Sequence, residues 1–363
     1  MGERQPALGW VPRSLTDPGI PDRATCVRPG GMRNSPTNEY RTMRAKLGQC
    51  EWLSVGAWLA TWGCLLGSRL VSPDLAAAAE PIRVLVWDEQ QPQQRQAYEN
   101  FLGNAIAAAL AKEPDLRVIS ANLGEPEQGL SATVLDNTDV LIWWGHVRQH
   151  EISWELAQRI VARVEAGQLD LVALHSAHWS RPFVEAMAVR TRADARKRYP
   201  DPPGGPPVKF EFLPPTLGQV PTADSLVTPA YYALRGGNGQ LTVRVDLPNC
   251  VFPAYRGDGA PSRSRVLLPK HPLAEGLPVT FEIPQTEMYN EPFHVPEPDE
   301  TIIEETWERG ERFRSLMAWR IGSGRVVYYR PGHETYPVYR QKQPLDVLRN
   351  AVRWLGRPDP KDL

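Results

Sequence analysis

Four of the seven histidines in this sequence come directly after short apolar runs. They are His146 after residues 140–144, His175 and His178 after residues 171–174, and His333 after residues 325–329. If these runs are strands of a parallel sheet, their carboxyl ends lie at one edge, where α/β proteins bind ligands. A lone histidine in such a loop more often bonds a backbone carbonyl, but four at one edge predict a shared site. Imidazole near neutral pH can transfer protons or bind a metal ion.

Carboxylates in TEMYNEPFHVPEPDE, residues 286–300, form a second group of candidates. Glu287 lies beside the aromatic Tyr289, and Pro292 prevents a helix from running through the segment. A carboxylate in such a rigid setting would be a metal ligand, an acid–base group or the partner of an arginine. Arg314, between apolar residues in ERFRSLMAW, is the arginine that would pair with it in a purely structural role.

Apolar runs of strand length alternate with helix-like segments from residue 82 onward. Strands are expected at 82–87, 116–120, 140–144, 171–174, 279–283, 302–306, 313–319 and 325–329, and helices at 93–112, 153–165 and 344–355. This alternation predicts an α/β fold in which helices cover both faces of a parallel sheet.

The composition is that of a globular protein, with 42% hydrophobic residues, 23% charged residues and a net charge of -1. No dense basic stripe is present, so a nucleic-acid partner is not expected. Many of the 36 prolines fall between residues 200 and 272 and predict a loop-rich insertion over 196–265. The α/β domain is expected over 80–357, with 358–363 as a tail.

The first 79 residues differ in pattern from the rest. Residues 1–42 are rich in Arg, Pro and Gly without periodicity, which indicates a disordered or untranslated leader. Residues 43–79 have basic residues, the apolar run WLSVGAWLATWGCLLG and the alanines of AAAAEP, the layout of a secretory signal peptide. Cleavage would give an exported, periplasmic or extracellular protein without stable membrane insertion. The alternative is a single N-terminal membrane anchor.

Six motifs occur in an order that resembles the ThuA-like, or trehalose-utilisation, family. They are WWGH, LHSAHWSRPF, HPLAEGLP, EMYNEPFHVPEPDE, FRSLMAW and GRVVYYRPGHETYPVY, and the resemblance covers residues 82–357. It implies a flavodoxin-like fold similar to class I glutamine amidotransferases: a mostly parallel sheet, helices on both faces and here a Pro-rich insertion. It also implies a role in the catabolism of disaccharides such as trehalose by way of 3-keto sugars.

The sharp turn that the resemblance implies lacks a nucleophilic cysteine in this chain. His175 and Ser176 occupy that turn, and Cys250 lies in LPNCVFP, which does not have the strand–turn–helix pattern of a nucleophile elbow. Glutaminase chemistry is therefore not expected. Cys250 is also the one cysteine left after removal of the leader, so no intrachain disulfide is predicted.

The candidate residues are assigned three roles. The expected catalytic groups are Glu287, His175 and Glu334, the expected substrate-binding groups are Trp144, Tyr289, Arg314 and Tyr336, and the expected metal ligands are His146, His178 and His333. Imidazole and carboxylate suit Zn²⁺ or Mn²⁺. Aromatic faces with a few polar groups suit a sugar ring.

These assignments lead to two hypotheses of different classes. The first is an enzyme that isomerises or eliminates at a keto-sugar with the help of a divalent metal. The second is a saccharide-binding or scaffolding protein without catalysis, in which the histidines are loop residues. A hydrolase with Ser176 as nucleophile is a further alternative, and a homo-oligomer remains open in each case.

Overall fold

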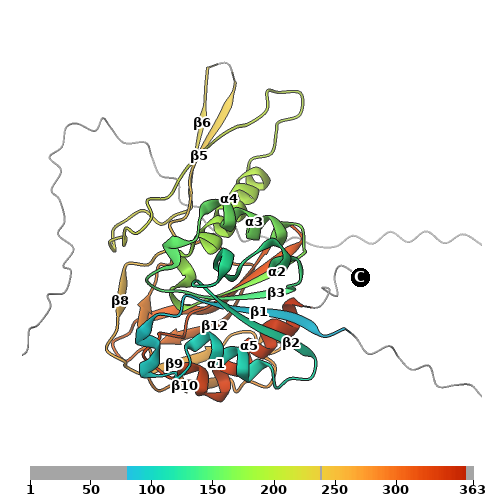
Figure 1. Ribbon diagram of the computed structural model, residues 1–363. Coiled ribbons are helices and arrows are strands. Elements are labelled where there is room, and N and C mark those ends of the chain that lie inside the picture. The colour runs from blue at the N-terminus through green and yellow to red at the C-terminus, as the bar shows by residue number, and fades with distance from the viewer. Residues whose placement is uncertain (1–79, 238, 357–363) are drawn as a thin grey trace, which may run out of the picture. The chain divides into compact units, whose positions relative to one another are not determined.

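The computed structural model describes residues 80–237 and 239–356, and a nine-stranded sheet organises them (Figure 1). The strand order is β10-β9-β12-β13-β14-β4-β3-β1-β2. The predicted leader over 1–42, the predicted signal peptide over 43–79 and the tail over 358–363 lie outside the described residues. Within the described part of the chain, no helix is long and apolar enough to span a membrane.

One half of the sheet is parallel. Its strands, in spatial order, are β2 (Leu116–Asn122), β1 (Ile82–Asp88), β3 (Val140–Trp144), β4 (Asp170–Leu174) and β14 (Gly324–Tyr329). Apart from the edge strand β2, these strands are almost completely buried runs of mainly Val, Ile, Leu and aromatic residues, as expected when helices cover both faces. The α/β class predicted from the sequence is confirmed.

The other half of the sheet is antiparallel. Beyond β14 the strands are β13 (Arg312–Ile321), β12 (Glu300–Thr306), β9 (Ser262–Val266) and β10 (Thr280–Ile283). The expectation of a mostly parallel sheet is therefore corrected to a mixed sheet. The physical reason is the tight turn between β13 and β14, which returns the chain beside itself. Gly322 in that turn has a φ of 60°, and a Cβ there would lie 2.4 Å from the Glu165 carbonyl oxygen.

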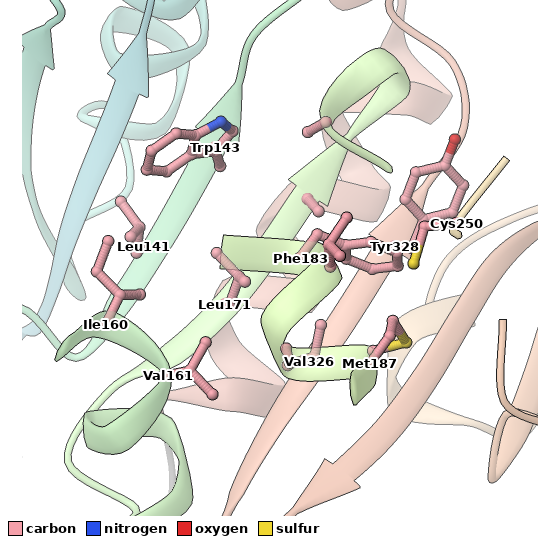
Figure 2. Close-up of a cluster of buried hydrophobic side chains, with 14 of the residues drawn as sticks. Leu141, Trp143, Ile160, Val161, Leu171, Phe183, Met187, Cys250, Val326 and Tyr328 are labelled. Atoms are coloured by element: carbon pink, nitrogen blue, oxygen red, sulfur yellow. The ribbon is translucent and has the colours of Figure 1, made fainter. Parts of the chain in front are cut away.

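Helices cover both faces of the sheet (Figure 1). Helices α1 (Leu102–Leu110) and α5 (Lys342–Leu355) pack in one apolar core, and α3 (Trp154–Glu165) and α4 (Arg181–Arg198) pack in the other. Alternate residues of β1 enter alternate cores, Val84 and Val86 on one side and Leu85 and Trp87 on the other. Figure 2 shows Ile160 and Val161 of α3 in the second core with strand residues such as Leu141 and Leu171. The short α2 (Ala132–Asp136) precedes β3.

The proline-rich segment contains strands of its own. Strands β5 (Lys209–Leu213), β7 (Leu241–Asp246) and β6 (Ala230–Arg235) form a separate three-stranded sheet, and β8 (Ala254–Arg256) pairs with β11 (Met288–Asn290). Ala195 of α4 packs in a small apolar cluster with Val208, Val243 and Val245. This cluster joins the three-stranded sheet to the end of α4.

A fully buried ion pair joins the end of β14 to β12. Arg330, the residue after β14, donates from Nη2 to Glu305 Oε1 at 2.9 Å and from Nε to the other carboxylate oxygen. Its Nη1 donates to Thr286 Oγ1 at 2.9 Å and to the Glu287 carbonyl oxygen at 2.5 Å. Two serine hydroxyls of β9 also donate to Glu305. The pair therefore fixes β14, β12, β9 and the segment before β11 relative to one another.

Replacing Arg330 by Met is expected to lower the free energy of unfolding by about 3–5 kcal/mol, because the Glu305 carboxylate would stay buried without its counter-ion. Urea denaturation followed by circular dichroism measures the loss. The matched control is Lys342→Met, which breaks a pair whose lysine side chain is 75% exposed. Exposed pairs contribute about 0–1 kcal/mol. Equal losses in the two variants would contradict the structural role of the buried pair.

Candidate functional site

Three histidines converge at the carboxyl ends of β3, β4 and β14. The ring centroids of His175 and His333 are 5.5 Å apart, those of His146 and His333 are 5.7 Å apart, and those of His146 and His175 are 6.1 Å apart. Glu287, just before β11, and Glu334 lie among the three rings. We call these five residues the His–Glu cluster. Three of the four histidines expected at one edge thus share a site.

A buried carboxylate positions the loop that bears His146. Glu89, the residue after β1, is 1% exposed and accepts hydrogen bonds from the backbone N–H groups of Val147 and Arg148 at 2.8 and 2.9 Å. The chain consequently turns immediately after β3 and presents His146 at the sheet edge. Sequence reasoning did not single out Glu89. The signal was available, because Glu89 also follows a buried strand.

His175 occupies a strained backbone position directly after β4. Its φ is 53°, a region that residues other than glycine rarely adopt. The Tyr328 hydroxyl donates to the His175 carbonyl oxygen at 2.9 Å, and the Arg330 carbonyl oxygen lies 3.0 Å from His175 Nδ1. Because a carbonyl can only accept, Nδ1 carries the hydrogen. The side chain is fully buried, with Nε2 left for another partner.

A glycine and a buried tryptophan shape the loop that bears His333. Gly332 has a φ of 130°, and a Cβ there would lie 2.8 Å from the Tyr339 ring. Trp144 Nε1 donates to the Gly332 carbonyl oxygen at 2.9 Å, and its side chain is fully buried. Trp144 was expected to contact substrate. The structure corrects this expectation, because Trp144 braces the loop from inside the α1–α5 core.

Each carboxylate of the His–Glu cluster pairs with a different histidine. Both oxygens of Glu334 lie 3.0 Å from His146 Nδ1, whereas His333 Nδ1 is 3.7 Å from the nearer one. Glu287 Oε2 lies 3.2 Å from His175 Nε2. His333 Nδ1 is 2.9 Å from the Thr335 hydroxyl oxygen.

Burial and pairing act in opposite directions on the pKa values of this cluster. Burial alone would raise the pKa of Glu334, but the hydrogen bond to His146 and the charges of His146 and His333 together hold that pKa at about 2. Burial lowers the pKa of His146, yet the same bond and the charges of the nearby glutamates together leave it above its ordinary value. Burial also opposes ionisation of Glu287, but the contact with His175 and the charges of the three histidines together keep its pKa below its ordinary value. Burial lowers the pKa of His333 to about 4. Both carboxylates are therefore ionised near neutral pH.

A pocket of ≈ 450 Å³ opens beside the cluster. Its polar edge contains His146, Ser176 and Glu287, and most of the remaining wall is apolar or aromatic: Val147, Trp179, Val220, Val251, Phe252, Tyr255 and Tyr289. Tyr289 was expected to bind substrate, and its hydroxyl lies 3.3 Å from both ring nitrogens of His175. Tyr336, expected in the same role, donates to the Gly257 carbonyl oxygen at 2.9 Å, and its ring lies beside His333.

His178 was expected to be a metal ligand, and the structure places it outside the groups that could share an ion. Its Nδ1 lies 2.5 Å from the Cys250 carbonyl oxygen, and its ring packs against Phe252, Phe293 and Tyr328. Burial lowers its pKa to about 3. We therefore correct this assignment: His178 is a neutral residue of the pocket wall.

Arg314 pairs with Glu291 rather than with Glu287. Its Nε donates to Glu291 Oε1 at 2.9 Å, and its Nη1 lies 3.4 Å from Glu297 Oε2. Glu287 instead contacts His175. The alternative in which Arg314 holds Glu287 in a structural pair is thus wrong. Arg314 is also not among the residues that line the pocket, so the structure does not favour substrate contact for it.

The chain matches one protein family and several solved structures. The ThuA family model, described as trehalose utilisation, matches residues 83–355. No curated protein matches the chain. Among solved structures, a ThuA-like protein from Bacteroides uniformis shares 14% identity with a TM-score of 0.48, covering 78% of this chain and 95% of that one. A ThuA-like protein from Parabacteroides merdae shares 15% identity with the same TM-score and coverage. Because the family match extends over most of its length, this chain belongs to the ThuA, or trehalose utilisation, family.

Proposed function

We propose that this protein is an enzyme of saccharide catabolism that transfers a proton on a keto-sugar, in a metal-assisted isomerisation or an elimination. The observation that carries this proposal is the His–Glu cluster, in which ionised carboxylates and imidazoles meet at the edge of a largely apolar pocket. Perturbed titratable groups in a concave site are typical of catalytic centres. The family supports a saccharide, of which trehalose or a 3-keto disaccharide is the proposed example.

The proposal includes a flavodoxin-like, or class I glutamine amidotransferase-like, arrangement of the parallel half of the sheet. The order β2-β1-β3-β4-β14 supports it, because the second, first, third, fourth and fifth parallel strands lie in flavodoxin-like order. Such sheets bind ligands at the carboxyl ends of their strands. His146, His175 and His333 follow three of these ends.

Glu287 is the proposed base. Its carboxylate lines the pocket, is 8% exposed and is ionised near neutral pH. It would take the proton from the carbon next to the keto group, leaving the electron pair as an enolate. Returning the proton to the former carbonyl carbon, with transfer of the hydroxyl proton to the enolate oxygen, completes an isomerisation. Departure of a substituent from the carbon on the other side of the deprotonated carbon completes an elimination. A divalent metal, Zn²⁺ or Mn²⁺, would supply stabilisation of the negative enolate oxygen.

The other members of the cluster would orient the substrate. Glu334 fixes the ring of His146, which lines the pocket and can hydrogen-bond a sugar oxygen. Phe252 and Tyr255 offer aromatic faces to the apolar side of a sugar ring. Among the residues that the structure describes, no lysine or arginine lines this pocket, which favours an uncharged saccharide.

A saccharide-binding protein without catalysis is the second candidate, because the same pocket would bind a sugar without turnover. The hydrolase alternative is weaker. The Ser176 hydroxyl lies 3.4 Å from the Tyr289 hydroxyl, and no hydrogen bond joins it to an imidazole among the described residues. A serine nucleophile needs such a base.

The first functional prediction is turnover of a keto-sugar. Purified protein incubated with 3-keto-trehalose and Zn²⁺ or Mn²⁺ should give an isomerised or eliminated product, followed by NMR. In D₂O an isomerised product, or substrate recovered from an elimination, should acquire deuterium at the carbon next to the keto group, since the base exchanges its proton with solvent. Binding of trehalose or 3-keto-trehalose by calorimetry, with neither turnover nor exchange, would favour the binding protein.

The second functional prediction concerns Glu287. The Glu287→Gln variant keeps the shape of the side chain but removes the base, so turnover should fall by about 10²- to 10⁴-fold. The matched control is Glu297→Gln, because the Glu297 side chain is 87% exposed and lies outside the cluster. Circular dichroism checks that both variants are folded. A folded Glu287→Gln variant with the turnover of the control would remove Glu287 from the mechanism.

A further inference from the structure

We infer that one divalent metal ion binds between His175, Glu287 and His333. One ligand atom from each of these residues lies within 4.8 Å of the others. Two imidazoles and one carboxylate form a ligand set of catalytic metal sites, in which open positions remain for water or substrate. This inference deepens the proposed function by assigning the ligands of the ion. It rests on that function for what the ion does, but binding itself can be measured without a substrate. Glu287 would bind the ion through Oε2, the oxygen that faces His175, and keep Oε1 as the base.

The contact between His175 and Glu287 calls for a cation. His175 Nδ1 donates to the Arg330 carbonyl oxygen, so a neutral His175 presents a lone pair at Nε2. That lone pair lies 3.2 Å from Glu287 Oε2, another acceptor, and 3.3 Å from the Tyr289 hydroxyl, which can donate to it. Two acceptors at this distance need a proton or a metal ion between them. Ligands about 2.0–2.2 Å from a tetrahedral or octahedral ion lie roughly 3.0–3.5 Å apart, so the observed separation fits two ligands of one ion.

His333 completes the set from the third strand end. Its ring is at 74° to that of His175, with 5.5 Å between the centroids. Its Nδ1 accepts from the Thr335 backbone N–H at 3.3 Å and lies 2.9 Å from the Thr335 hydroxyl oxygen. In the tautomer that binds an ion through Nε2, Nδ1–H would instead donate to that hydroxyl oxygen. Histidines that bind metals usually donate their other ring N–H to such an outer partner. For His175, the Arg330 carbonyl oxygen is such a partner, because it accepts from Nδ1–H.

His146 and Glu334 are assigned to a neighbouring pair rather than to the ion. With His333 they form a second group close enough to hold a metal. However, both oxygens of Glu334 are 3.0 Å from His146 Nδ1, and an N–H donated to a carboxylate satisfies that contact without a cation. The geometry therefore points to one ion, with His146 beside it at the pocket.

Metal titration of the full chain tests this assignment. After chelator treatment and dialysis, Zn²⁺ content is measured by elemental mass spectrometry, and Co²⁺ binding is followed by visible absorption. One equivalent should bind. The Glu287→Gln and His333→Gln variants should each weaken binding by more than about 100-fold, beyond the range typical of outer partners. His146→Gln should stay within about tenfold of the unchanged protein, and His150→Gln, a substitution of an exposed histidine, should have no effect.

Several results would overturn the assignment. The first two are a protein that binds no metal and a protein that binds two equivalents. The others are a folded Glu287→Gln variant with unchanged metal affinity, and an equal loss of metal affinity in His146→Gln and His333→Gln. Failure here is distinct from failure of the proposed function. Turnover of 3-keto-trehalose by a metal-free protein would keep the function and remove the ion. One bound equivalent without turnover or deuterium exchange would keep the ion and remove the function.

Discussion

The buried pair of Arg330 and Glu305 is the interaction on which the rest of the site depends. Removing two charges from water is costly, and this cost is offset only when every polar atom of the pair has a partner. Here the guanidinium donates to Glu305, Thr286 Oγ1 and the Glu287 carbonyl oxygen, and the carboxylate also accepts from two serine hydroxyls of β9. These partners come from separate strands and loops. The pair can therefore form only when the antiparallel half of the sheet is in register with β14.

The same arginine links the fold to the chemistry of the site. Its guanidinium fixes the backbone of Glu287, while its carbonyl oxygen accepts from His175 Nδ1 and so determines which nitrogen of that ring faces the carboxylate. Arg330 thus holds both His175 and Glu287 in place. Arg330 itself cannot move without breaking its buried ion pair with Glu305. Such fixed dipoles and carboxylates need little reorganisation when charge develops on a substrate.

The proline-rich segment contributes one wall of the pocket. Val220 and Tyr255 from this segment line the same pocket as His146, Ser176 and Glu287 of the polar edge. The edge supplies imidazole, hydroxyl and carboxylate groups, and the wall supplies apolar and aromatic surface. This division suits a ligand with one reactive polar face and one face of C–H groups, as a sugar ring has.

The sequence by itself determined the α/β class, because runs of strand length alternate with amphipathic helices, and it placed His146, His175 and His333 at one edge, because they follow buried strands. It also identified Glu287 from its rigid aromatic setting. Only the tertiary structure decided between His175 and His178, since the 3-10 turn (His175–Trp179) directs one ring to Glu287 and the other to the Cys250 carbonyl. Likewise Arg314 pairs with Glu291, Trp144 faces the core, and Glu89 and Arg330 support the site. Periodicity specifies which residues lie at a strand end, but the direction of a loop side chain depends on partners far away in sequence.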